Sequence, residues 1–539
     1  MFSIVRLVTC QYSGKMNIMS DNKIVFTEQD LYRTLRKHDK VIMSRFDDPN
    51  ISDSDYFFCG INSDIVSNGI SILINKMSGN IESVGVDNSC RAIIEAFAIM
   101  RMDALGKISD LQKSIYRHQY ALVDFDNFKS LLSEEDKSNP ILDKVKADRK
   151  TAIELACKLL KCKSSDLKRH DCDDPAFYLK SNINSSIRFS TIVGTYLPQM
   201  FDIYNFFSMF IHPRFEINPD VENIFQTMKK EVYVKEILDY LVSYLRATKL
   251  IVMDRTTNDF NADFWNNPLT QTNVISIKML ENAFINLEKE LCQIDKKQYD
   301  GFAWYYIEKM RYLTIDMSMN MALGYKEQVI NKFKSFIEYT AVYVMVNTLD
   351  YEKDYKQVKL GYLYSSRLQI EEHIKALGGK EIPLVNKEEL KKLYEDYYKE
   401  KYGLSSYEDY KREMRNNSFY FIDSGIRSYN KYINQMIDVL FNDEDDKKQV
   451  KFLYKYAKDT EHASGYNFNS SEGIWSTNCF LTLHMVFKLL MMLILQSGLT
   501  LAEHGYNPNI KNEVSLFKEF AKTYYDEYLK VVKEYTPKD

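Results

Sequence analysis

The chain has 539 residues, of which 45% are hydrophobic and 14% aromatic. This is enough apolar material to fill the cores of more than one domain, so the composition excludes a disordered chain. A formal net charge of −4 excludes the global positive field that is typical of nucleic-acid-binding domains. Eight scattered cysteines without paired spacing exclude a disulfide framework and favour reduced thiols in the cytoplasm.

Helix breakers are rare in this sequence. The chain contains 10 Pro and 18 Gly, well below the usual roughly 5% and 7% of residues. Long stretches hold neither residue and are rich in Lys, Glu, Leu, Met and Ala, which are strong helix formers. The sequence therefore predicts an all-α protein.

In the first half of the chain, turn signals at Asp48-Pro49-Asn50 and Ser78-Gly79 separate amphipathic segments. Pro213 cannot continue a helix without cost, so it places His212 at a helix end. We expect helices over residues 28–47, 54–77, 84–105, 107–150 (interrupted at Asn139-Pro140), 151–161, 187–211 and, as a connecting helix or pair, 218–257.

The second half begins after an irregular stretch, 256–272, rich in Asn, Asp, Pro and Thr. We expect helices over residues 274–296 and 300–323, around Glu338, from Phe452 to near His462, and over 479–496 and 515–535. The segment 479–496 is strongly apolar, but it falls short of the roughly 20 residues of a membrane span and contains His484 and Lys488. It is predicted to be a buried core helix, and no membrane contact is expected.

Two patterns occur twice, in the same order. Arg91-x3-Glu95 returns 243 residues later as Lys334-x3-Glu338, and Tyr204-x7-His212 returns 250 residues later as Tyr454-x7-His462. The nearly constant separation indicates an internal duplication that gives two diverged helical-bundle units. The expected division is an N-terminal extension that can be disordered (1–24), a first unit (25–215), a connecting helix and linker (216–273), a second unit (274–500) and a C-terminal helix (501–539).

The first copy, with Arg91, Glu95, Tyr204, Ser208 and His212, resembles a bacterial family of helical domains that is similar to the HEPN group, many of whose members are ribonucleases or nucleotide-binding modules. The second copy departs from the pattern. It has Lys334 in place of the arginine and Lys458 in place of the serine, and lysine cannot offer the planar fork of a guanidinium.

Three classes of function stay open; the resemblance implies the defence setting and the ribonuclease, and the third class is some other enzyme. The first is a binding, scaffold or sensor protein of the bacterial cytoplasm, in the setting of anti-phage defence. The second is a HEPN-like, metal-independent ribonuclease or toxin, with His212 and His462 as acid or base beside Arg91 and Glu95. Tyr204, Ser208, Lys334, Glu338 and Tyr454 would then bind the ligand. The same residues also fit a structural role, in which Glu95 pairs with Arg91 inside the bundle.

Both readings require the two polar stripes of the first unit to meet. Arg91 and Glu95 lie one turn apart on one helix, and Tyr204, Ser208 and His212 lie one turn apart on another. A buried polar group left unpaired costs about 1–3 kcal/mol, so we expect hydrogen bonds between the stripes.

Other motifs carry less information. Arg33-x4-His38 and Arg367-x5-His373 match the ribonuclease spacing, but about one match is expected by chance. The loose cluster of Cys157, Cys162, His170 and Cys172 lacks paired zinc spacing, so we expect no metal site. No cofactor motif is present, and RNA, a protein partner and a homodimer all stay open as partners.

Overall fold

A computed structural model describes residues 27–46, 50–122, 140–167, 176–182, 187–211, 219–247, 302–322, 325–348 and 443–460, with single positions beside these ranges. Within these residues the regular elements are helices and no strand occurs. The all-α prediction is therefore confirmed for the described part of the chain.

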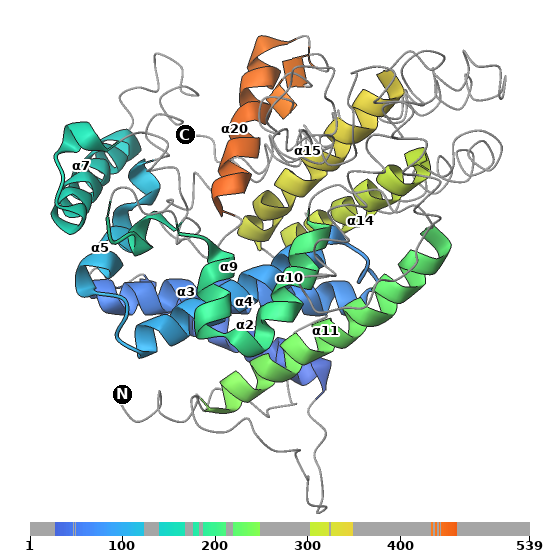
Figure 1. Cartoon of the computed structure of the whole chain (residues 1–539), viewed down its shortest axis with the longest axis horizontal. Helices are drawn as coiled ribbons and strands as arrows, with labels where there is room; N and C mark the ends of the chain where they lie inside the picture. The colour runs from blue at the N-terminus through green and yellow to red at the C-terminus, as the bar shows by residue number, and fades with distance from the viewer. Residues whose placement is uncertain are drawn as a thin grey trace, which may run out of the picture.

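Three antiparallel helices form the first layer (Figure 1): α2 (Glu28–Phe46), α3 (Asp53–Met77) and α4 (Val84–Ala104). Their ends follow local chemistry. The Ser52 hydroxyl accepts from the Asp55 backbone N–H at the start of α3, and Ser83 accepts from Gly85 at the start of α4. Gly79, with φ of 74°, ends the turn after α3, because a left-handed residue there is best supplied by glycine.

Helix α3 is the central element. It is long and apolar enough to cross a membrane by length and composition, yet 94% of its apolar window is buried inside the protein. Helices α2, α4 and α5 (Asp110–His118) pack along it. This enclosure is typical of the core helix of a bundle.

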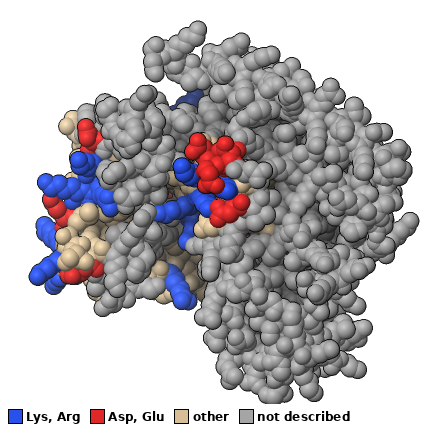
Figure 2. Space-filling view, turned by 90° about the horizontal axis from the view of Figure 1, so that it is seen from above, with Lys and Arg blue, Asp and Glu red and all other residues tan. Residues whose placement is uncertain are grey.

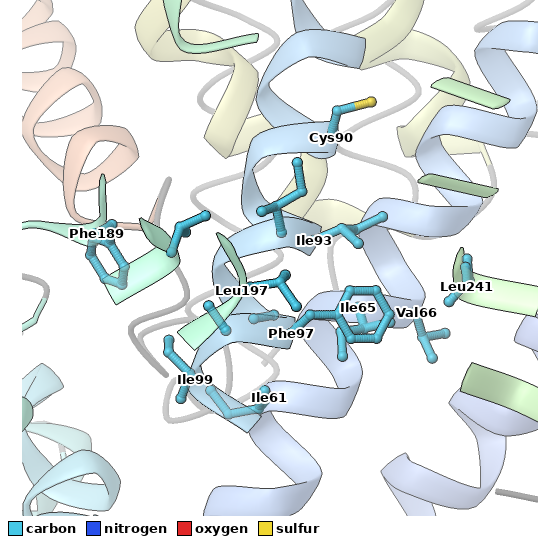
Figure 3. Packing of buried hydrophobic residues seen from close by; sticks show 14 of the residues in the cluster. Ile61, Ile65, Val66, Cys90, Ile93, Phe97, Ile99, Phe189, Leu197 and Leu241 are labelled. Carbon is cyan, nitrogen blue, oxygen red and sulfur yellow. The ribbon is translucent and has the colours of Figure 1, made fainter. Parts of the chain in front are cut away.

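The main hydrophobic core lies between α3 and α4 (Figure 3), where Ile61, Ile65 and Val66 of α3 meet Ile93 and Phe97 of α4. The short helices α9 (Phe189–Tyr196) and α10 (Phe201–Phe210) cover α4. The long helix α11 (Pro219–Ala247) crosses α3 and α4 and buries Leu241 in the same core. Helix α7 (Pro140–Leu160) packs on α5 at the edge of the molecule.

The remaining described helices form a second layer. An antiparallel pair, α14 (Phe302–Ala322) and α15 (Lys326–Thr348), leans against α3 and α4, and α20 (Glu444–Thr460) packs on α15. The order repeats the first layer: α3, α4 and α10 pack in sequence, as do α14, α15 and α20. This correspondence of order is what the proposed duplication requires.

Two expected elements were wrong in detail. The single helix expected over 187–211 is divided into α9, a 3-10 turn (η4, Pro198–Met200) and α10, because the residue before a proline is disfavoured in α conformation and Leu197 has φ −137° and ψ 51°. Pro140 begins α7 instead of interrupting a helix, and α7 continues through the break expected at 150. The expected helices at 274–296, 479–496 and 515–535 lie outside the described residues.

Candidate functional site

The two polar stripes of the first unit meet as expected. The Tyr204 hydroxyl on α10 donates a 3.0 Å hydrogen bond to Glu95 Oε1 on α4. Arg91 Nε lies 3.6 Å from the same Glu95 oxygen, one helical turn away. The prediction that these helices are neighbours and share a hydrogen bond is confirmed.

This cluster is closed to solvent. Glu95 is 0% exposed and Arg91 and Tyr204 are each 6% exposed. Burial raises the pKa of the Tyr204 phenol well above its usual value, the Glu95 charge raises it further, and Arg91 and the Ser208 hydroxyl partly oppose both effects. The phenol is therefore a permanent donor to the carboxylate. A substrate in solvent has no path to Glu95 through the described residues.

The second unit contains the same contact. The Tyr454 hydroxyl on α20 donates a 3.2 Å hydrogen bond to Glu338 Oε1 on α15. Glu338 is 1% exposed, Tyr454 5%, and Lys334, one turn before the glutamate, 6%. The structure thus places Lys334, Glu338 and Tyr454 together, inside the core. His212 and His462 lie outside the described residues, so their part in either site stays a prediction.

A second polar cluster, which the sequence analysis did not identify, lies where the two layers meet. We call it the seam. Asn75 Nδ2 of α3 donates to Asp316 Oδ1 of α14 at 2.7 Å, and Asn320 Nδ2 of α14 donates to Ser71 Oγ of α3 at 3.3 Å. Ser71 and Asp316 are 245 residues apart in the chain, and so are Asn75 and Asn320. The two bonds are therefore reciprocal, with each helix supplying one amide donor and one acceptor.

A charged pair in the second layer adds to these bonds. Lys332 Nζ of α15 lies 3.8 Å from Asp316 Oδ1 and donates to Ser71 Oγ at 2.9 Å and to Gln328 Oε1 at 2.9 Å. Asp316 and Lys332 are both 0% exposed. Burial raises the pKa of Asp316, whereas Lys332 and hydrogen bonds from Asn75 and Ser83 oppose this rise.

The backbone of α4 approaches the seam very closely at Gly85. A Cβ atom on this residue would lie 1.8 Å from Asp316 Oδ2 and 2.6 Å from Lys332 Cε. No side chain fits at that separation. Gly85 therefore sets how near the start of α4 can come to α14 and α15.

A further buried ion pair lies beside the seam. Lys230 Nζ of α11 is 2.9 Å from Asp87 Oδ1 of α4 and also donates to the Ser83 carbonyl at 3.0 Å. Burial raises the pKa of Asp87 to about 6, against the opposing charges of Lys230 and Lys309. One signal in the sequence could have revealed the seam: Ser67, Ser71 and Asn75 follow helical spacing along α3 and so form one polar stripe.

The secondary motifs do not form accessible sites among the described residues. His38 is only 9% exposed, and burial lowers the pKa of its imidazole. An imidazole buried in this way is a poor acid or base for a substrate in solvent. Cys157 and Cys162 are free thiols, and no group of three or more metal-binding side chains occurs in the described ranges. Arg367, His373, His170 and Cys172 lie outside them.

Searches against family models, curated proteins and solved structures found no match to this chain.

Proposed function

We propose that the chain is a helical binding or scaffold protein of the bacterial cytoplasm, built from two similar units, in which the repeated polar residues hold the fold together. The defence setting rests on the resemblance to the HEPN-like family alone.

One observation carries the proposal: the same Tyr–Glu hydrogen bond occurs in both units, and it is buried in both. A catalytic carboxylate must reach its substrate, whereas Glu95 and Glu338 are enclosed by neighbouring helices. A pair of buried contacts repeated at matching positions is typical of a framework. The reciprocal bonds of Asn75 and Asn320 across the seam support the same interpretation, because they are buried contacts that join α3 to α14.

The test is incubation of the purified full-length protein with labelled total RNA, alongside an Arg91→Ala variant and a His212→Ala, His462→Ala double variant. We expect intact RNA in every reaction. Arg91→Ala should lower the melting temperature, because it leaves the buried Glu95 charge without its partner.

Cleavage by the unsubstituted protein would contradict the proposal if it disappears in the histidine double variant while the melting temperature stays the same. That result would instead support the ribonuclease that the resemblance also implies. The melting curves of all three proteins therefore accompany the RNA assay.

A further inference from the structure

Helix α7 is attached to the molecule by one face. Its buried side chains Val145, Ala152, Ala156 and Leu160 recur at helical spacing and turn towards α5. The Asp148 carboxylate also turns inward, where His118 Nδ1 lies 3.1 Å from Oδ1 and the Tyr120 hydroxyl donates to Oδ2. Burial raises the pKa of Asp148, but these two hydrogen bonds outweigh it and lower the pKa overall. The negative charge of Asp148 is thus directed to the interior.

The opposite face of α7 carries lysines. Lys146, Lys150 and Lys158 are exposed and lie four or eight residues apart on α7, so they share one side of the helix, and exposed Lys161 directly follows the helix. We call these four residues the lysine face. From Lys146 to Lys158 it extends for about 18 Å along the axis, at 1.5 Å per residue. In Figure 2, Lys and Arg side chains stand along the left edge of the molecule with Asp and Glu side chains between them, on the side where Figure 1 places α7.

Among the residues that the structure describes, few acids lie near the lysine face. Only Asp143 and Glu154 are exposed acids on α7. No ion pair within the described part of the chain involves any of the four lysines. Helix α20 shows the contrast, since its Lys447, Lys448 and Lys451 lie 2.6, 3.6 and 2.5 Å from Glu444, Asp445 and Asp438.

The chemistry of this face favours a polyanion bound from solution. Among the described residues, the large apolar side chains that are exposed are Val41, Met43, Phe58, Leu105 and Val232, and none belongs to α7. A helix that binds in a membrane surface needs a free apolar face, but that of α7 is packed on α5. Lysine ammonium groups act as point charges that contact phosphates without reading bases.

We propose that the lysine face of α7 binds the sugar-phosphate backbone of a nucleic acid. This proposal rests on the proposed function as a binding protein and names its partner. The contact is electrostatic, so it is independent of base sequence and weakens as salt rises. Glu154 lies among the lysines and separates them into two pairs, each able to contact the phosphates of one segment.

The test is fluorescence anisotropy of the full-length protein with a labelled 20-nucleotide single strand, as RNA and as DNA of the same sequence, at several salt concentrations. The variant Lys150→Glu, Lys158→Glu should bind both strands at least about tenfold more weakly and show a smaller salt dependence. The control Lys235→Glu, Lys448→Glu makes the same charge change at exposed lysines of α11 and α20 and should bind like the parent.

Three results would overturn the proposal: no binding by the parent protein, equal weakening in both double variants, or a lysine-face dependence seen only with vesicles of anionic lipid. Equal affinity for RNA and DNA supports backbone contacts alone, and a preference for RNA supports the proposal with an added 2′-hydroxyl contact. The length of the RNA or DNA oligonucleotide is checked after each titration, to detect cleavage. Cleaved RNA together with lysine-dependent binding would contradict the proposed function but leave this inference in place.

Discussion

Asn75 of α3 and Asn320 of α14 each donate a hydrogen bond to the helix of the other, to Asp316 at 2.7 Å and to Ser71 at 3.3 Å respectively. Asn320 also donates to Asp316 Oδ1 at 2.7 Å, so the two amides share one carboxylate. Asp316 is thus one of the buried groups through which the two layers are joined.

Because the amides share Asp316, their substitutions should not be additive. We expect Asn75→Ala and Asn320→Ala each to lower the free energy of unfolding by about 1–3 kcal/mol. The double variant should show an interaction energy of at least about 0.5 kcal/mol. Urea unfolding of the parent protein, the two single variants and the double variant gives the four free energies of this double-mutant cycle. Strict additivity would mean that the two amides act on Asp316 independently, against the geometry.

Gly85→Ala should destabilise the protein although alanine is the better helix former. The gain in helix propensity is at most about 1 kcal/mol, whereas a Cβ 1.8 Å from Asp316 Oδ2 forces α4 away from α14 at a cost of about 1–3 kcal/mol or more. Gly194→Ala in α9 is the control, because its nearest contact would be a Phe201 ring carbon at 3.3 Å. Thermal unfolding followed by circular dichroism distinguishes the two. A neutral or stabilising effect at Gly85 would show that the seam is looser than described.

Tyr204→Phe and Tyr454→Phe should have matching effects. Each removes a hydroxyl that donates to a buried carboxylate, at 3.0 and 3.2 Å, and hydrogen bonds to charged groups are worth about 1.5–3 kcal/mol. Both variants should melt at lower temperature and keep their helical circular dichroism spectrum. Were only one of the two to matter, the framework roles of the two contacts would not be equivalent.

Stability should depend on pH through Asp87. Its pKa rises from 3.8 to about 6 on folding, so the folded state binds a proton more tightly than the unfolded state between these values. Asp87 therefore lowers the free energy of unfolding by about 3 kcal/mol in all as pH rises from about 4 to about 6. Above that range it adds nothing to the dependence of the free energy of unfolding on pH. In Asp87→Asn this component is absent. Urea unfolding at pH 4.5, 5.5, 6.5 and 7.5 measures the difference in slope between the two proteins, and identical slopes would contradict the assignment.

Local signals predicted the first layer well. Helix α3 begins one residue before the expected position and α4 ends one residue before its expected end. The signals are local: Ser52 and Ser83 cap the starts of α3 and α4, and Gly79 lies in the turn between them. The Tyr204–Glu95 contact was also predictable, since two polar stripes on apolar helices need each other.

The seam was not predictable in the same way. Ser71 and Asn75 mark a polar stripe on α3, but nothing nearby in sequence indicates that their partners are Asp316 and Asn320. Helical spacing gives the face on which a residue lies and leaves open which distant helix covers that face. The break at Pro198 was missed for a different reason, because the apolar spacing continues across it.

The distance in sequence between α3 and its partners has a consequence during synthesis. Ribosomes add about 5–20 residues per second. The 245 residues that separate Ser71 from Asp316 therefore take roughly 12–50 s to synthesise, and α3 has no α14 to pack against during that time. During that interval α2, α4 and α11 can cover its apolar sides, whereas Ser71 and Asn75 keep their water. A stripe of hydroxyls and amides tolerates this exposure better than leucines would, because it offers other nascent chains little apolar surface to adhere to.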